Sequence, residues 1–371
     1  MLPQSSSSLM SAPTAHSQGS RDEIAKSGMK DKAEYVLGYA YSIVLNALFI
    51  TAYIVVVSEL ISGRWRWRDM LTLIVTFHVV GICVSVFYHR YFVHRSFLFT
   101  RAGKWLARPW IAWAGMASWS GPPRAWAALH ERHHQVTEIR GKDPHGPIRS
   151  IVDICYVFMI FYTPTLGRIV DYEAYAKRHT NRYDWFEKHI CGTLGYIIFG
   201  LVMPLAVARY FNVLVWYFAA VGLAFGGTST VNTLGHAGEY FRSKPGWLRG
   251  PLGWLFFQKY SANYCGDSLN SRPWIAPVTG YFTAGEINHN SHHQFPNSAQ
   301  IGAHWYDVDL GWWLICTLER AKLVRRVRRQ SPQEIDEDSW ARDASTKHRH
   351  TPTRVAAPDP RQATPPPQPV S

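Results

Sequence analysis

The sequence predicts an all-α integral membrane protein with four transmembrane helices and a helical cap outside the bilayer. Of its 371 residues, 47% are hydrophobic and 14% aromatic, and these are gathered into long apolar runs with polar chain between them. Clusters of histidine lie in the polar chain or where the apolar runs end. A soluble chain of this length could form one large domain or two, but the long apolar runs argue against a soluble protein.

The expected membrane domain occupies residues 35–330. Residues 1–34 are rich in Ser, Ala and charge without apolar periodicity, so we expect a disordered tail. They do not resemble a signal peptide, because the first apolar run comes late and is too long for one. Residues 331–371, dominated by Pro, Gln and charged side chains, are expected to form a second disordered tail.

Four apolar runs are long enough to cross a hydrocarbon layer of ~30 Å. We expect spans at about residues 35–60, 70–88, 191–210 and 213–231. A short turn with three Arg and two Trp joins the first two spans, and Phe211 and Asn212 join the last two. Four spans place both termini, His89 and His236 on the same side of the membrane.

The segments between the spans are expected to lie at the membrane surface. Residues 102–120 are Trp-rich but interrupted by Lys104, Arg108 and Pro109, which favours an interfacial or re-entrant segment. Residues 150–166 suggest a shorter interfacial stretch, and residues 305–329 an amphipathic interfacial helix. The net charge is +13, and the basic residues are interleaved with Trp, which indicates contact with anionic lipid. Nucleic-acid binding is not favoured, because no recognition motif for it is present.

The orientation of the spans rests on the distribution of basic residues. The three arginines between the first two spans oppose the positive-inside rule, whereas the long connection between the second and third spans is richer in Lys and Arg. We therefore expect both termini to face the cytoplasm. The five cysteines are scattered, without a C-x-x-C pair, which favours packing residues in a reducing compartment over thiol chemistry.

A repeated H-x-x-H-H pattern is the main chemical signal. Positions i, i+3 and i+4 of an α-helix share one face, so each copy directs three imidazoles at one spot. A third cluster consists of His89 and His94, which are five residues apart, or roughly 140° around an α-helix. These two side chains can reach one site only if the helix ends or bends between them, or if the site contacts the helix on two sides. The two copies are His130, His133 and His134, and His289, His292 and His293.

Together with His236 these clusters supply nine histidines, more than the four to six ligands of one metal ion. The pattern therefore predicts two ions. Imidazole suits Fe, Zn, Cu and Ni, so the ligands do not identify the metal. Structural zinc is typically closed by four Cys or His ligands. A pair of redox-active irons is favoured, because a lipid-facing site has few tasks for such a cluster except oxygen chemistry on hydrocarbon.

The histidine segments resemble the membrane fatty-acid desaturase family, the acyl-CoA Δ9 (stearoyl-CoA-type) desaturases and their bacterial relatives. The resemblance covers roughly residues 35–325 and is carried by GICVSVFYHRYFVHRSF, by ALHERHHQ followed by Asp143-Pro144-His145, and by GEINHNSHHQFPNSA. It implies a cytosolic helical cap with a non-haem di-iron centre. From VNTLGH it also implies that Asn232 reaches an iron through water. The implied iron ligands are His89, His94, His130, His133, His134, His236, His289, His292 and His293.

The implied activity is introduction of a cis double bond, at Δ9, into a saturated acyl chain. O2 is the co-substrate, and two electrons come from a separate donor of the ferredoxin, rubredoxin or cytochrome b5 type, since no cytochrome b5 segment is visible.

The acyl carrier stays open between CoA, acyl carrier protein (ACP) and phospholipid, because Ala128 and Leu129 replace the Arg-Asp of animal members. Bacterial relatives commonly read G-E-G-W-H-N-N-H-H, and this chain departs at Ile287, Asn288 and Ser291. The implied location is the bacterial inner membrane, with the site cytoplasmic.

Two other functions remain open at this point. A fatty-acid hydroxylase or alkene-forming decarboxylase could share the same scaffold, and only the product would distinguish them. A non-catalytic metal- or haem-handling membrane protein is a third hypothesis, but it predicts histidines along a transbilayer path. The clusters instead lie on one expected side of the membrane.

Several further residues have two interpretations. Trp126 and Trp274 either line the lipid path or anchor the protein at the interface. Glu286 either orients a histidine ligand or caps a helix, and His145 either orients a ligand or belongs to a surface loop. His78, within the second expected span, is interpreted as a helix-packing hydrogen-bond partner.

Overall fold

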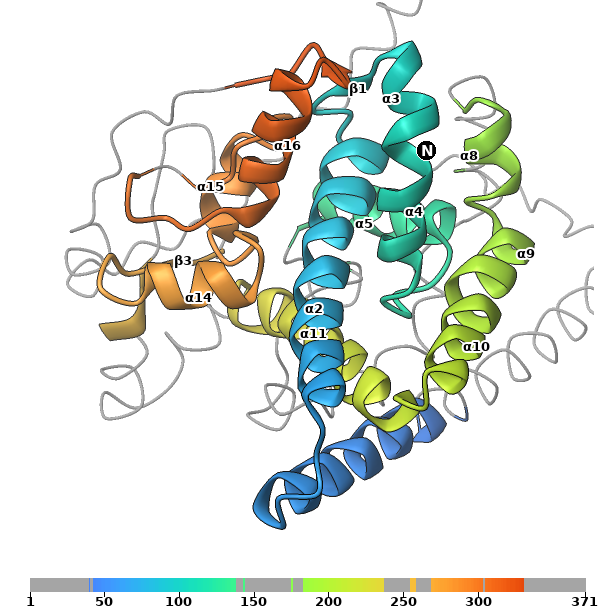
Figure 1. Ribbon diagram of the computed structural model, residues 1–371. Coiled ribbons are helices and arrows are strands. Elements are labelled where there is room, and N and C mark those ends of the chain that lie inside the picture. Colours follow the sequence, from blue (N-terminus) through green and yellow to red (C-terminus); the bar gives the residue numbers. More distant parts are fainter. Residues whose placement is uncertain are drawn as a thin grey trace, which may run out of the picture.

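The computed structural model describes residues 40, 43–137, 143, 175, 183–236, 254–257, 268–302 and 304–329, which are mostly helical (Figure 1). The tails expected at residues 1–34 and 331–371 lie outside the described residues, and so does the interfacial stretch expected at residues 150–166.

 The described part of the chain therefore corresponds to most of the expected membrane domain.

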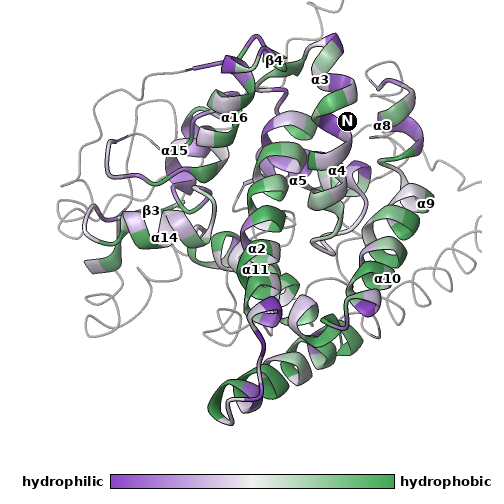
Figure 2. Ribbon diagram, in the orientation of Figure 1, coloured by the Kyte–Doolittle hydropathy of each residue, from purple (hydrophilic) through white to green (hydrophobic). Residues whose placement is uncertain are grey.

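Within the described residues, four helices are long and apolar enough to cross a membrane, the number that the sequence predicts. They are Ile43–Ile61, Trp67–Val93, Thr193–Tyr210 and Leu214–Asn232. Figure 2 shows hydrophobic residues concentrated on these helices, whereas hydrophilic residues are more frequent towards α15 and α16. The second span has 27 residues, and at 1.5 Å per residue it is longer than the ~30 Å of hydrocarbon. One end of this helix therefore extends beyond the hydrocarbon layer.

The second span consists of α2 (Trp67–Cys83) and the π-helix η1 (Val84–Val93), which follows it without a break. Asp69 in the first turn of α2 accepts hydrogen bonds from the backbone N–H of Arg66 at 2.8 Å and from its guanidinium at 2.9 Å. An acidic side chain in this position is favourable to the helix dipole. Arg66 also donates to the carbonyl oxygen of Asn212 at 3.2 Å. This bond joins the two tight turns, so both helical hairpins end at the same level.

The span hairpins pack through small and aromatic residues. Helix α11 (Leu214–Leu234) has its most extensive contact with α2. The third span combines α9 (Thr193–Gly195), η4 (Tyr196–Val202) and α10 (Met203–Tyr210). Phe49 of the first span is buried against Val221 and Phe225. Gly222 allows this approach, because a Cβ there would press on the ring of Phe49.

The other helices of the described residues lie beside α2 and η1 in Figure 1. They are α3 (Arg101–Leu106), α4 (Arg108–Met116), α5 (Pro123–Gln135), α8 (Trp185–His189), α14 (Ala276–Phe282), α15 (His289–Gln294) and α16 (Leu310–Arg320). Two short antiparallel strand pairs connect distant segments: β1 (Leu98–Phe99) with β4 (Val324–Arg325), and β2 (Phe256–Phe257) with β3 (Asn270–Ser271). Leu98 is opposite Arg325, and Phe256 is opposite Ser271.

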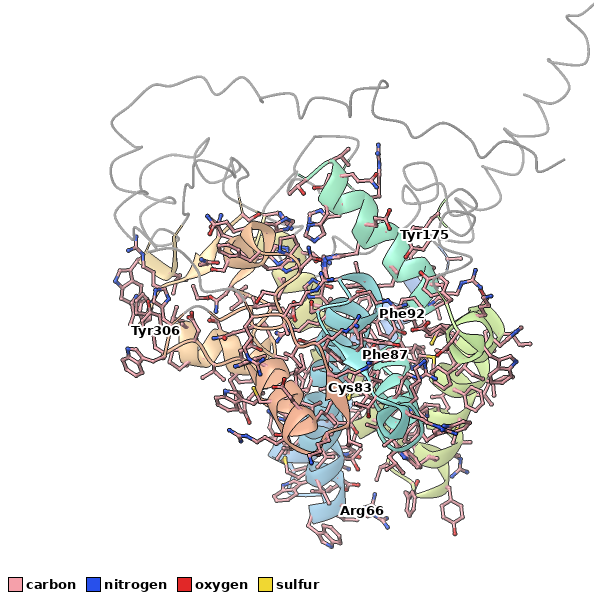
Figure 3. The ribbon with its side chains drawn as sticks, turned by 90° about the horizontal axis from the view of Figure 1, so that it is seen from above. Arg66, Cys83, Phe87, Phe92, Tyr175 and Tyr306 are labelled. Atoms are coloured by element: carbon pink, nitrogen blue, oxygen red, sulfur yellow. The ribbon has the colours of Figure 1, made fainter. Side chains whose placement is uncertain are left out.

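The largest buried core surrounds η1. Phe87 and Phe92 are fully buried, and Figure 3 shows them in the interior of the helical array, whereas Arg66 and Tyr306 lie at its edge. Helix α8 is attached to this core by Glu187, which accepts from the hydroxyl of Tyr91 at 2.6 Å and from Arg95 at 2.7 Å. The packing of η1 on every side fixes the position of the residues that it carries.

The amphipathic helix expected at residues 305–329 is wrong in its extent. Helix α16 ends at Arg320, and Val324 and Arg325 form the extended strand β4. The helix cannot continue, because Lys322 and Arg326 have φ angles of +58° and +53°, in the left-handed region. The chain on either side of β4 makes backbone hydrogen bonds instead: the N–H of Thr100 donates to the carbonyl of Leu323 at 2.9 Å, and the N–H of Arg328 donates to the carbonyl of Ser96 at 2.8 Å.

Substitution of Gly103 by alanine is expected to weaken the attachment of β4. A Cβ at this position of α3 would overlap the carbonyl oxygen of Leu323, so the backbone must move. Overpacking of this kind costs roughly 1–3 kcal/mol. We expect thermal unfolding of purified Gly103→Ala in detergent to begin several degrees below that of the wild type. Gly81→Ala is the matched control, since a Cβ there has open space; equal melting temperatures for both variants would contradict the prediction.

Candidate metal centre

The π-helix η1 brings His89 and His94 to one site. The backbone N–H of His94 donates to the carbonyl of His89 at 3.2 Å, which is the i→i+5 bond of a π-helix. The two ring centroids lie 4.9 Å apart. An α-helix would separate these side chains by roughly 140° around its axis. The wider turn of η1 thus resolves the geometric difficulty that the spacing of five residues raised.

The two H-x-x-H-H segments are helical, as their spacing indicates. The first lies in the last turns of α5, which begins after Pro122 and ends at Gln135. The second forms the short helix α15. Strand β3 supports α15, because the side chain of Asn270 donates to the hydroxyl of Ser291 at 3.0 Å and accepts from its backbone N–H at 3.1 Å. Ser291, one of the departures from the bacterial pattern, therefore has a structural partner.

The histidines form two groups, and within each group the ligand nitrogens all lie within 4.8 Å of one another. Each H-x-x-H-H segment contributes to both groups, a division that the sequence did not indicate. The five-histidine group is His89, His94, His130, His134 and His292, and the four-histidine group is His133, His236, His289 and His293.

The spacing of the nitrogens suits metal ions. In the five-histidine group, the Nε2 atom of His292 lies 3.0 Å from those of both His89 and His134. In the four-histidine group, the Nε2 atom of His293 lies 3.0 Å from that of His133 and 3.1 Å from that of His289. Two neighbouring imidazoles bound at ~2.1 Å to one ion and ~90° apart would have nitrogens about 3.0 Å from each other. The residues present therefore fit one ion in each group.

One carboxylate orients a histidine in each group. Glu286 Oε2 lies 2.6 Å from His89 Nδ1, and Asp143 Oδ1 lies 2.7 Å from His133 Nδ1. A carboxylate can only accept, so the proton of each imidazole belongs on Nδ1 and the lone pair on Nε2 faces the other histidines. The structure thus places Glu286 against a histidine of the five-histidine group.

Asp143 was not singled out as an orienting residue from the sequence. The Asp-Pro-His segment after the middle histidines carries the signal, but the residue proposed there as an orienting group is His145, which lies outside the described residues. Asp143 and His133 are both fully buried. A carboxylate placed near a candidate ligand segment could have been considered on the same grounds as Glu286.

Three of these imidazoles are held in their neutral form. Burial, together with the neighbouring His89 and His236, lowers the pKa of His134 to about 3. Burial and the surrounding histidines also lower the pKa values of His292 and His293 well below the ordinary range. Neutral imidazole is the form that binds metal, so at neutral pH these side chains are ready to act as ligands.

A narrow cavity connects the histidines with the membrane spans. It is lined by Gly81 and Val84 on one side and by Ala224 and Gly227 of α11 on the other, and it reaches His89, His130 and His289. Trp126 and Asn232 also line it, and the Trp126 ring stacks on His130 with centroids 4.8 Å apart and planes 12° apart. The cavity therefore runs from apolar helices to the two histidine groups.

Trp274 lies elsewhere. Its side chain is half exposed, its ring packs against Trp254 with centroids 3.9 Å apart, and its indole N–H donates to the carbonyl of Trp254 at 3.0 Å. It is not among the described residues that line the histidine cavity. Of the two tryptophans considered for the lipid path, the structure brings only Trp126 to the histidines.

Comparison with known proteins identifies similar sequences. No family model matches the chain. It is 27% identical over 270 residues to Delta-9 acyl-lipid desaturase 1 of Arabidopsis thaliana, covering 71% of this chain and 77% of the relative. It is 28% identical over 262 residues to sn-2 palmitoyl-lipid 9-desaturase of Nostoc sp., covering 69% and 79%. It is also 28% identical over 271 residues to Hex-5-enoyl-[acyl-carrier protein] acetylenase of Moorena producens, covering 69% and 75%.

Asp143→Asn is expected to weaken metal binding at the four-histidine group alone. The variant keeps the shape of the side chain but removes the charge beside His133. Loss of such a partner typically lowers metal affinity 10–100-fold. After dialysis against a weak chelator, we expect mass spectrometry of the purified protein to find about one ion fewer per chain than in the wild type.

Asp184→Asn is the matched control for this measurement. Asp184 is an acidic residue that pairs with Arg108 at 2.6 Å and caps α8. Its loss perturbs the fold without removing a partner of the histidines, so metal content should stay at the wild-type value. Equal metal content in Asp143→Asn, Asp184→Asn and the wild type would contradict the orienting role of Asp143.

Proposed function

We propose that this chain, which is similar over most of its length to acyl-lipid desaturases, is an oxidoreductase that introduces a cis double bond into a saturated fatty-acyl chain at a pair of iron ions. The observation that carries the proposal is the pair of histidine groups at the end of a cavity that begins among membrane spans. In the overall reaction, one CH2–CH2 unit loses two hydrogens, and O2 takes up these together with two electrons and two protons to give two waters.

The proposed ligands follow the two groups. One iron would be held by the five-histidine group, and the other by the four-histidine group with Asn232 acting through water. Asn232 lines the cavity four residues before His236, which supports this assignment. Iron bound there would supply the activation of O2, which side chains alone cannot provide.

The protein's own contribution is to position the acyl chain and exclude water. Ala224, Gly227 and Val231 line the α11 side of the cavity with short apolar side chains or none, which leaves room for a hydrocarbon chain. The hydroxyl of Thr228, also on this side, donates to the carbonyl of Ala224 at 3.3 Å, so its proton is satisfied within the helix. Trp126, stacked on His130, gives a rigid wall beside the site. Placement of one CH2–CH2 unit next to the metals would then determine which bond reacts.

The position of the double bond and the acyl carrier belong to the same proposal. We assign the Δ9 position, because the names of two relatives specify Delta-9 or 9-desaturation. The names of two relatives refer to a lipid-bound chain and to acyl carrier protein, so they support a lipid or ACP as the carrier. CoA is the third carrier to be tested.

The donor and the orientation complete the proposal. The two electrons would come from a separate protein of the ferredoxin, rubredoxin or cytochrome b5 type. The chain would lie in a bacterial inner membrane with the histidine groups and both termini on the cytoplasmic side. The length of α2 and η1 supports a site at the membrane surface, because their combined 27 residues exceed the hydrocarbon thickness.

Expression in a desaturase-deficient bacterial host tests the proposal. We expect new monounsaturated acyl chains with the wild type and none with His133→Ala, measured by mass spectrometry after derivatisation that locates the double bond. Separation of phospholipid, CoA and ACP fractions at early times identifies the carrier. His304→Ala is the control, since His304 pairs with Asp307 and belongs to neither histidine group; it should give the wild-type product.

The other functions give different results in the same host. Hydroxylated or terminal-alkene products would replace desaturation by one of the related oxidations. An unchanged lipid profile, with expressed and iron-loaded protein and a supplied electron donor, would exclude catalysis on these lipids and favour metal handling. A C-terminal reporter found outside the cytoplasm would overturn the proposed orientation.

A further inference from the structure

Arg90 is a buried charge directly after a histidine of the five-histidine group. Its side chain is 1% exposed, although arginine is almost never fully buried without partners. The guanidinium donates to Asp309 Oδ1 at 2.7 Å, to Glu286 Oε1 at 3.2 Å and to the carbonyl of Ala299 at 2.8 Å. One cation therefore holds two carboxylates and a backbone group in the interior.

Glu286 divides its two oxygens between this network and the histidine. Oε2 accepts from His89 Nδ1, while Oε1 accepts from Arg90 and from the hydroxyl of Ser85. Ser85, His89 and Arg90 all belong to η1. The π-helix thus presents the histidine and also supplies two donors that fix the rotation of the carboxylate beside it.

Asp309 anchors the other side of Arg90. Its carboxylate accepts from the backbone N–H of Ile301 at 3.0 Å and of Trp312 at 2.9 Å, so it ties the chain after α15 to the start of α16. The approach of α16 to η1 is close. A Cβ on Gly311 would lie 2.6 Å from Ser85 Oγ and 3.0 Å from the guanidinium carbon of Arg90. Arg90 is therefore held by a rigid frame rather than by Glu286 alone.

We propose that Arg90 is a positioning residue for the five-histidine metal site, where it fixes Glu286 so that the His89 Nε2 lone pair points at the ion. This inference rests on the proposed metal centre. Its effect is confined to one of the two sites, because the carboxylate that orients the four-histidine group is Asp143. The measured consequence is a lower metal affinity of the five-histidine site, about 10–100-fold if Arg90 acts fully through Glu286.

A double-mutant cycle tests whether Arg90 acts through Glu286. Full-length wild type, Arg90→Gln, Glu286→Gln and the double variant are purified in detergent, and Co2+ is titrated into the metal-free proteins while its absorption spectrum is recorded. We expect each single variant to weaken one of two binding events by a similar factor. The double variant should be no weaker than either single one, because both changes remove the same support.

Two further variants keep the outcomes distinct. Arg108→Gln is the control, since Arg108 is also buried and paired with a carboxylate, Asp184; it should lower thermal stability and leave both binding events at wild-type affinity. Arg90→Lys keeps the buried charge but cannot reach all three acceptors. It decides the question if Arg90→Gln does not fold. Its expected result is weaker binding at one site.

Two results would overturn the inference. One is wild-type affinity at both sites in folded Arg90→Lys or Arg90→Gln. The other is a double variant whose losses are the product of the two single losses, which would mean that Arg90 and Glu286 act separately. Failure of the wild type to bind two ions would instead refute the proposed metal centre.

Discussion

The structure depends on holding nine imidazoles close together, seven of them buried. To serve as ligands, they must turn their lone pairs towards the same small space. Two carboxylates set the tautomers of His89 and His133, and the surrounding helices fix the ring positions. The dense packing of η1, with Phe87 and Phe92 fully buried, follows from this requirement.

Much of the fold was accessible from the sequence, because its signals are periodic and strong. Runs of apolar residues predicted four spans, and H-x-x-H-H spacing indicated helical segments with clustered side chains. What the sequence did not disclose depends on local backbone geometry. The π-helix that joins His89 to His94 has no composition signal, and Lys322, which follows α16 in the left-handed conformation, is not a residue type associated with that conformation.

The candidate site was predictable as a set of residues but not as an arrangement. The histidines could be named because each lies in a recognisable spacing. Their division into five and four depends on how α5 and α15 face each other, which is a tertiary property. Asp143 and Arg90 illustrate the same limit. A carboxylate or an arginine is usually a surface residue, and only its buried partners distinguish it.

The division of each H-x-x-H-H segment between the two groups also bears on biosynthesis. Helix α5 contributes to both groups, and so does α15, near the end of the described chain. Neither proposed ligand set is complete before residue 292 has been synthesised, after all four spans have left the ribosome. A nascent chain therefore carries no finished site that could trap a metal early. Uptake of the proposed ions would be a late event, coupled to the closing of the cap over the inserted helices.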